Sequence, residues 1–196
     1  MPDLEPIPPA AAGTHFPIET ERLLIRPFEP SDAETIFETW GDPEAMRWIP
    51  SGAHPDVETT RQRIGRFMEH QAAHGFSLWP VIEKASGRIL GDCGLLLVEW
   101  RGPEVELAYR FGRAAWGRGF ATEAAGACLR HGFGVAGLDT IIAITHPDHL
   151  ASRRVMAKNG MRLVGEVQYY GMNLVKYVKT KVEFDAERAA GAGQRS

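Results

Sequence analysis

The middle of the chain carries three strand-like segments joined by short turns, and this feature most restricts what the chain can fold into. The segments cover residues 76–83, 88–100 and 105–111, and the turns lie at 85–87 and 101–103. Short connections that contain Gly, Pro or Ser join strands that neighbour each other in an antiparallel sheet. The sequence therefore predicts an antiparallel meander at the centre of the molecule.

Helices and further strands flank this meander on both sides. Ser31 and Glu34 have the spacing of a capping box, which predicts that a helix begins at Ser31. Gly160 is suited to a left-handed position at the end of a later helix. The other expected elements are a strand over 22–28, helices over 57–72, 121–135 and 150–159, and strands over 140–145, 162–170 and 173–182. This order predicts an α/β fold with a mixed, largely antiparallel central sheet flanked by helices.

Length and composition favour one soluble domain. A chain of 196 residues with 44% apolar and 24% charged residues can bury a substantial core as a single unit. We expect residues 1–17, which are rich in Pro and Ala, to form a flexible tail, and residues 183–196 to form a second one. The predicted domain therefore covers residues 18–182.

Charge and hydropathy exclude several classes of partner. A net charge of −3 does not suit a nucleic-acid surface or a polybasic membrane anchor. No apolar run approaches the roughly 18 residues of a membrane span, and the first residues lack the basic and apolar regions of a signal peptide. We expect a cytoplasmic protein without nucleic-acid or membrane partners, and the sequence does not decide between a monomer and a homodimer.

The segment WGRGFATEA, Trp116 to Ala124, lies where a strand is expected to end and a helix to begin. Gly117 and Gly119 allow a ligand to approach the backbone closely, and a helix start offers unpaired N–H groups to phosphate oxygens. The chain has no Gly-Lys-Ser/Thr loop and no G-x-G-x-x-G. Backbone amides would therefore hold the phosphate, with Arg118 as a charge partner. The alternative is a purely structural turn.

Four segments of the chain together resemble the GNAT superfamily of N-acetyltransferases. ELAYRFGRAAWGRGFATEA, from Glu106 to Ala124, resembles the cofactor-binding motif of that family, and HPDHLASRRVMAKNGMRLVGE resembles the helix and strand that follow it. TERLLIRPFEPSDAETIF and GFSLWPVIEKASGRILGDCGL are similar to the RimJ/RimL branch, which acetylates the N-termini of ribosomal proteins. The resemblance covers roughly residues 19–182 in the expected order.

The resemblance implies a GNAT-like fold in which two splayed strands hold acetyl-CoA. The family pattern x-x-x-G-x-A spans Trp116 to Ala121, whose amides would bind the pyrophosphate, and the pantetheine arm would pair with the backbone near Tyr109 to Phe111. The implied cofactor-binding residues are Tyr109, Phe111, Trp116, Gly117, Arg118, Gly119, Phe120, Ala121, Thr122, His149 and Ser152.

Two side chains match catalytic positions of the family. Glu106 matches the Glu of E-x-x-Y and is the candidate that accepts a proton from the amine; Glu104 and an ordered water are the alternatives. Ser152 matches the Ser of N-x-x-S and is the candidate donor to the departing thiolate, or it is a hydroxyl that caps the helix start. His149 stands where the family usually has Asn, so its contact with the pantetheine arm is open.

These residues predict an acetyl-CoA-dependent N-acetyltransferase that acts by direct attack of a primary amine on the thioester. The amine belongs to a protein N-terminus or to a small molecule, and Trp48 is placed near it. The alternative from another class is a non-catalytic acyl-CoA-binding module. No metal is expected, because His146 and His149 lack a third ligand.

Overall fold

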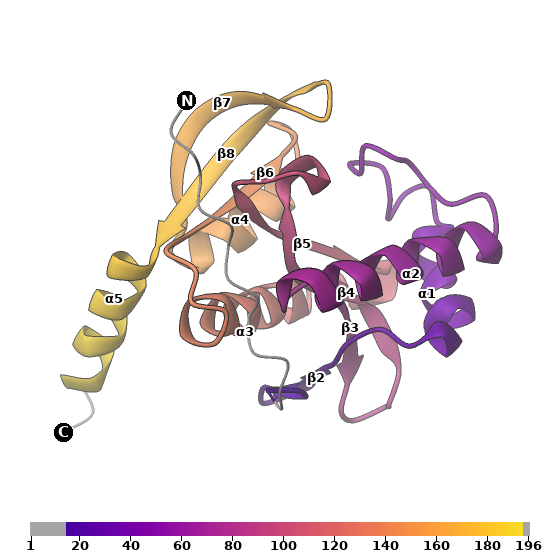
Figure 1. The fold of residues 1–196 in the computed structure, drawn as a ribbon, viewed down its shortest axis with the longest axis horizontal. Helices are drawn as coiled ribbons and strands as arrows, with labels where there is room; N and C mark the ends of the chain where they lie inside the picture. Colours follow the sequence, from indigo (N-terminus) through magenta and orange to yellow (C-terminus); the bar gives the residue numbers. More distant parts are fainter. Residues whose placement is uncertain (1–14, 194–196) are drawn as a thin grey trace.

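The computed structural model describes residues 15–193 and arranges them around an eight-stranded sheet (Figure 1). The strands are β1 Ile18–Glu19, β2 Leu23–Ile25, β3 Leu78–Glu83, β4 Ile89–Leu97, β5 Val105–Phe111, β6 Thr140–Thr145, β7 Arg162–Tyr169 and β8 Met172–Thr180. They lie in the order β1-β2-β3-β4-β5-β6-β8-β7, and all neighbours are antiparallel except the parallel pair β5 and β6. This topology confirms the predicted α/β fold with a mixed, largely antiparallel sheet.

Helices cover both faces of the sheet. The α-helices are α1 Ala33–Trp40, α2 Val57–His74, α3 Phe120–Gly134, α4 Leu150–Lys158 and α5 Lys181–Gly193, and the short 3-10 turns are η1 Pro30–Asp32, η2 Val98–Trp100 and η3 Arg113–Ala115. Alternate residues of β4 belong to different cores: Leu95 packs in the α3 cluster and Leu96 in the α1 and α2 cluster. Because side chains alternate along a strand, α1 and α2 cover the face opposite to α3.

The strands β5 and β6 separate soon after they meet. Within residues 15–193 their pairing consists of Glu106 opposite Ile142, whereas β4 and β5 pair from Gly91 to Leu97. The rest of β5 therefore has a backbone edge that β6 does not cover. This divergence confirms the splayed strands that the family resemblance implied.

Two local predictions differ from the structure. The capping box uses Glu29 and Asp32 rather than Ser31 and Glu34: Asp32 accepts a hydrogen bond of 2.8 Å from the Glu29 amide, and the Arg26 guanidinium holds its carboxylate. The strand predicted to reach residue 100 ends at Leu97, since positive φ values of 53° and 62° at residues 99 and 100 turn the chain.

The predicted C-terminal tail is helical over most of its length. Helix α5 is anchored where Phe184 packs on Phe133, with ring centroids 5.0 Å apart, and where Glu187 pairs with Lys179 at 2.5 Å. In Figure 1 this helix extends away from the sheet toward the C-terminus. In the predicted N-terminal tail, Phe16 already packs on Trp79 at 5.0 Å, and residues 1–14 lie outside the described residues.

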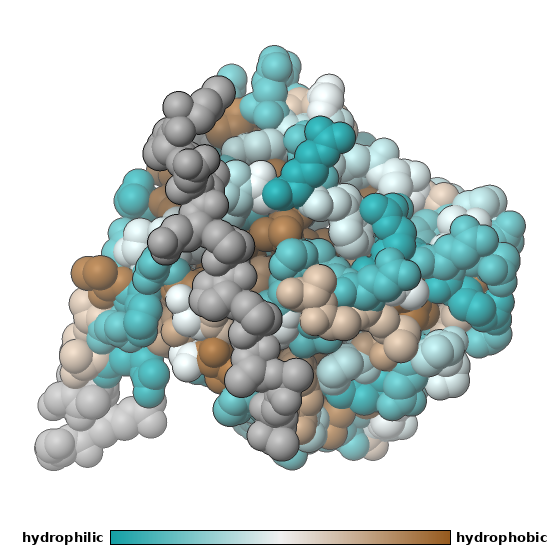
Figure 2. Space-filling view, viewed as in Figure 1, coloured by the Kyte–Doolittle hydropathy of each residue, from teal (hydrophilic) through white to brown (hydrophobic). Residues whose placement is uncertain are grey.

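The surface of this fold is mixed in character. Figure 2 shows hydrophilic and apolar residues intermixed on the face that carries α2. Among the helices of residues 15–193, none has the length and apolar character that a membrane crossing requires.

A buried ion pair joins the central strands to α1. The Asp92 carboxylate of β4 is fully buried and accepts hydrogen bonds from the Arg110 guanidinium of β5, the shortest at 2.7 Å, and from the Trp40 indole at 2.8 Å. Asp92 and Arg110 are also direct partners in the β4–β5 register. One carboxylate therefore satisfies a buried cation and a buried indole at once.

We predict that Asp92→Ala destabilises the protein by about 3–5 kcal/mol, because it leaves the Arg110 charge buried without a partner. Urea unfolding measures the change. Glu19→Ala is the matched control, since the Glu19–Lys84 pair is largely exposed and its loss should change stability little. Equal effects of the two substitutions would contradict this role for Asp92.

Candidate active site

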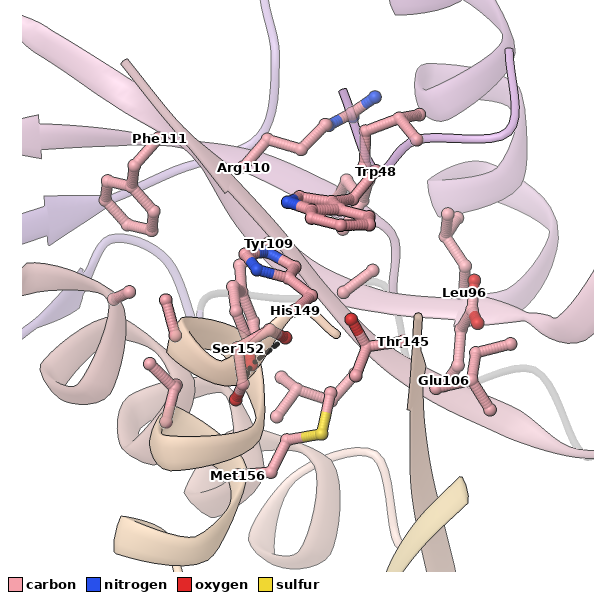
Figure 3. A pocket seen from close by; sticks show the side chains of 18 of the residues that line it. Trp48, Leu96, Glu106, Tyr109, Arg110, Phe111, Thr145, His149, Ser152 and Met156 are labelled. Carbon is pink, nitrogen blue, oxygen red and sulfur yellow. Dashed lines mark hydrogen bonds between the residues drawn. The ribbon is translucent and has the colours of Figure 1, made fainter. Parts of the chain in front are cut away.

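A cavity of about 990 Å³ opens where β5 and β6 diverge (Figure 3). Its walls come from β5, the starts of α3 and α4, the loop after α1, one face of α2 and the turn between β7 and β8. All the site residues predicted from the sequence line it except Arg118. Its volume is at the upper end for ligand pockets, so it can hold a large ligand.

One end of the cavity is built from backbone amides at the start of α3. Gly117 and Gly119 have φ values of 72° and 82°, which favour glycine, and a Cβ at Gly117 would point into open space. Within the described residues, the amides of Gly117, Arg118 and Gly119 have no hydrogen-bond acceptor, and the first N–H groups of α3 are unpaired as in any helix. These donors fit the pyrophosphate of a coenzyme A group.

Arg118 takes a different position from the one predicted. Its guanidinium pairs with Glu83 at 2.8 Å and lies over the Phe120 ring, outside the cavity. Arg22 lies beside it, donating to the Arg118 carbonyl at 3.0 Å and pairing with Glu123 at 2.6 Å. Arg22 and Arg118 are therefore already paired with carboxylates, whereas Arg154 and Lys158 of α4 line the cavity itself.

Two hydroxyl groups meet in the middle of the cavity. Tyr109 Oη of β5 lies 2.9 Å from Ser152 Oγ in the first turn of α4, and it also donates to the Ser152 carbonyl at 3.0 Å (Figure 3). Burial raises the pKa of Tyr109, so its hydroxyl keeps its proton near neutral pH. The sequence indicated Tyr109 for its backbone only, and its side-chain contact with Ser152 is a new element of the site.

Glu106 lies at the point where β5 and β6 still pair. Its side chain is buried, with 7% exposure, and Oε1 accepts a hydrogen bond of 2.8 Å from the Tyr170 hydroxyl. Burial raises the pKa of Glu106 to about 7, although the Tyr170 hydrogen bond and the Arg110 charge oppose this rise. A carboxyl with this pKa can exchange a proton near neutral pH.

Glu104, the competing carboxylate, is held in an ion pair outside the cavity. It contacts the Lys176 ammonium and the Tyr169 hydroxyl. Burial raises the pKa of Glu104, but these two bonds together outweigh burial and leave the pKa below its ordinary value. A permanently ionised, paired carboxylate is a poor proton acceptor, so Glu106 is the better candidate.

The Tyr170 side chain is fixed by the loop that follows β4. The Tyr170 amide donates to the Glu99 carboxylate at 2.8 Å, and the Glu99 amide donates to the Tyr170 hydroxyl at 3.1 Å. Glu99, Trp100 and Tyr170 all have positive φ, an uncommon conformation for residues other than glycine that recurs at functional sites. The predicted strand over 88–100 did not foresee this contact. The short connection between β7 and β8 at Gly171 was the one feature of the sequence that indicated a tight turn beside Tyr170.

His149 and Trp48 close the cavity near the start of α4. Their rings stack with centroids 5.2 Å apart, and the Trp48 ring also lies 4.8 Å from that of His146. Burial and, to a smaller extent, the His146 charge lower the pKa of His149, so it is neutral near pH 7. Trp48 therefore lines the cavity from the loop between α1 and α2. Within residues 15–193, no group of three or more His, Cys, Asp or Glu side chains could hold a metal ion.

Comparisons with known proteins agree with this architecture. The family model described as "Acetyltransferase (GNAT) domain" matches residues 22–162. The uncharacterized protein YkkB of Bacillus subtilis is 32% identical over 160 residues, which cover 81% of this chain and 92% of that protein. The uncharacterized N-acetyltransferase YnaD of Bacillus subtilis is 32% identical over 149 residues, covering 76% and 84%.

Solved structures show the same fold. A GNAT-family acetyltransferase from Bacillus anthracis matches with a TM-score of 0.73 and 31% identity, covering 85% of this chain and 99% of that one. A ribosomal-protein-S5-alanine acetyltransferase from Vibrio fischeri matches with a TM-score of 0.70 and 21% identity, covering 83% and 95%, a likeness of fold alone. Strand divergence, amide-lined turn and sequence similarity thus agree: the chain belongs to the GNAT family of acetyltransferases, which use acetyl-CoA as co-substrate.

Proposed function

We propose that the protein transfers the acetyl group of acetyl-CoA to a primary amine by direct attack of the amine. One observation carries this proposal: a single cavity holds both the open amides at Gly117 to Gly119 and the buried carboxyl of Glu106. The first fits the phosphates of a coenzyme A group, and the second fits a proton acceptor for an amine. Acetyl-CoA supplies the acetyl group as an activated thioester.

The backbone positions the bound cofactor in this proposal. The amides of residues 117–121 hold the pyrophosphate, and the uncovered edge of β5 offers backbone groups to the pantetheine arm, as an added strand would use them. The Trp116 indole already donates to the Phe111 carbonyl at 2.7 Å, which leaves the edge from residue 107 to 110 for such pairing. No cationic side chain is required at the phosphates.

Glu106 accepts the amine proton. A protonated amine has no lone pair for attack, so a nearby base must take the proton as the new bond forms. Because burial holds the pKa of Glu106 near 7, the carboxylate form is available at neutral pH and still binds a proton strongly. The Tyr170 hydroxyl at 2.8 Å orients the carboxyl toward the cavity.

Ser152 and Tyr109 supply a proton donor for the departing sulfur. The Tyr109 hydroxyl has one hydrogen, and either atom of its 2.9 Å pair with Ser152 Oγ can be the donor. When this hydrogen turns from the Ser152 carbonyl to Ser152 Oγ, the Ser152 hydroxyl hydrogen is free to point into the cavity. A thiolate leaves more readily when a hydroxyl can donate to it, because the thiol pKa near 8.5 makes a bare thiolate unfavourable at pH 7. A non-catalytic acyl-CoA-binding module would need the amide turn but not these groups.

We predict that acetyl-CoA stabilises the protein by about 2.7 kcal/mol at a hundredfold excess over its Kd, and that Gly117→Ala reduces this gain. The added methyl group would occupy the open space against the ligand. Gly87→Ala is the control, because Gly87 also has positive φ, at 68°, and open space around its Cβ, but lies in a distant turn. Thermal unfolding with and without acetyl-CoA measures both. Absence of any shift would contradict the proposed function.

We predict that Glu106→Gln lowers turnover by roughly 10²–10⁴ while acetyl-CoA still binds. In the unchanged protein, kcat/KM should rise as the pH passes through about 7, because the carboxyl loses its proton there. The variant should lack this step and recover part of its rate at higher pH, as more amine arrives neutral.

A pH–rate series with one amine and saturating acetyl-CoA measures this effect. Glu104→Gln serves as the matched control and should keep the step near pH 7, since Glu104 lies outside the cavity. If Glu106→Gln retained the full rate at every pH, the base would have to be a water molecule or Glu104.

We predict that Ser152→Ala lowers turnover by roughly 10²-fold with little change in acetyl-CoA affinity, because the hydroxyl acts only as the thiolate forms. Unlike Glu106→Gln, this variant should not recover at high pH. Tyr109→Phe removes the partner hydroxyl and should have a smaller effect. Steady-state kinetics and calorimetry separate the two parameters, and a larger loss in Tyr109→Phe would assign the donor to Tyr109 instead.

A further inference from the structure

Three arginine side chains line the part of the cavity that faces α2, on the same side of β5 as Glu106. They are Arg63 and Arg66 of α2 and Arg110 of β5. Asp92 pairs with Arg110 at 2.7 Å and neutralises its charge. In the part of the chain that the structure describes, Arg63 and Arg66 make no hydrogen bond or ion pair with a carboxylate. Within residues 15–193, these two cations therefore have no carboxylate bound to them, although Glu44 and Glu99 also line the cavity.

The position of Arg63 is unfavourable for a cation without a partner. Burial lowers the pKa of Arg63, and the positive charges of Arg110 and Arg66 lower it further. The neighbouring His54 responds in the same way: burial, then Arg110 and Arg63, lower its pKa to about 4, so it adds no charge. Arg63 is partly buried and Arg66 is exposed, so an anion that enters the cavity can reach both. A partly desolvated cation gains from such a partner.

The carboxyl groups near these arginines are engaged elsewhere. Glu106 accepts the Tyr170 hydroxyl, and Glu99 accepts the Tyr170 amide. Asp56 caps the start of α2 by accepting from the Thr59 amide. None of the three forms an ion pair with Arg63 or Arg66 within residues 15–193.

The strand geometry connects the arginines to the proposed base. Glu106, Ala108 and Arg110 alternate onto one face of β5, so roughly 7 Å of strand separates each from the next. Ala108, the smallest of them, lines the cavity between the carboxyl and the arginines and leaves room there. Arg63 and Arg66 line the same cavity from α2, so a ligand in it can contact both the carboxyl and the arginines.

Apolar rings hold the arginines and form the adjacent wall. The Arg66 guanidinium lies 4.3 Å from the centroid of the Trp100 ring, and Trp100 stacks on Phe67 at 5.5 Å. Trp48 lines the same cavity from the loop after α1. This wall can take up the apolar part of a ligand whose anionic group lies at the arginines.

We propose that Arg63 and Arg66 bind a carboxylate or phosphate group of the acetyl acceptor, which is thus a small amine that carries a negative group. The inference rests on the proposed function and gives its substrate class: amino acids and aminophosphonates fit, and polyamines do not. The cofactor phosphates are assigned to the other end of the cavity, at residues 117–121, so they do not account for these arginines. Guanidinium groups are the side chains best suited to oxyanions.

Binding of reaction products tests the proposal without turnover. N-acetylglycine, N-acetylphenylalanine and N-acetylaminomethylphosphonate are titrated into the protein with coenzyme A present, alongside the two N-acetylamino acid amides. These compounds carry no amine, so its ionisation does not affect the comparison. At least one anionic compound should bind roughly tenfold or more tightly than its neutral amide, and the phosphonate distinguishes a preference for phosphate from one for carboxylate.

Three variants assign the effect to the arginines. Arg63→Gln and the double variant with Arg66→Gln should lose the preference for anions. Arg61→Gln should keep it, because Arg61 belongs to the same helix but pairs with Glu34 and Glu58 outside the cavity. Arg63→Lys should retain part of it through its charge. Equal binding of anions and amides, no binding of any product, or an unchanged preference in the double variant would overturn the proposal.

Turnover assays separate this proposal from the proposed function. Amino acids, their amides, spermidine and a short uncharged peptide with an amidated C-terminus are compared at equal concentrations of neutral amine. If acetyl-CoA is consumed equally fast with amides, spermidine or the peptide, the acetyltransferase stands and the anion site is refuted. If no amine is acetylated but anionic products still bind through Arg63, the site stands and the catalytic proposal fails.

Discussion

The loss of pairing between β5 and β6 is the constraint on which the rest of the site depends. The two strands share the register only where Glu106 faces Ile142, and beyond this point β5 has an uncovered edge. Unpaired backbone groups inside a protein are costly unless a partner satisfies them. The divergence therefore creates the cavity and supplies polar groups that a ligand can bind. It also leaves Glu106 at the position where β5 and β6 still pair, and there burial raises its pKa.

The strand β5 divides the cavity by its two faces. The side chains of Tyr109 and Phe111 pack in the core on the α3 side, and Tyr109 contacts Ser152 at the start of α4. Glu106 and Arg110 alternate onto the face that α1 and α2 cover. Because a one-residue shift in register would exchange the two faces, the Asp92–Arg110 pair between β4 and β5 has a role beyond stability. It keeps the residues proposed to bind the cofactor and those proposed to bind the acceptor on opposite faces of β5.

Much of this arrangement could be predicted from the sequence, and most of the features that were missed share a cause. The bounds of β5 and β6 and the glycine turn at 117–119 follow from local patterns, and the family resemblance placed Glu106 and Ser152 on the cavity. Helix α5 depends on Phe184 meeting Phe133, and Tyr170 meets Glu99 across 71 residues of chain. Arg63 lies in the amphipathic helix α2, and the sequence alone does not distinguish it from the charged residues on the solvent-exposed face of that helix. Contacts between distant segments leave no such local signal.

The cations of the cavity differ in whether a carboxylate neutralises them. Near the start of α3, Arg22 and Arg118 are paired with Glu123 and Glu83, the turn offers backbone amides, and Arg154 and Lys158 of α4 also line the cavity. At the α2 end, Arg110 is paired but Arg63 and Arg66 are not, within residues 15–193. Backbone dipoles can hold a pyrophosphate without a fixed cation, since a helix start carries partial positive charge. An amine substrate would be repelled by bare cations unless it brought a negative group of its own. On the proposed assignments, the cofactor binds mainly to backbone and the acceptor binds through its anion.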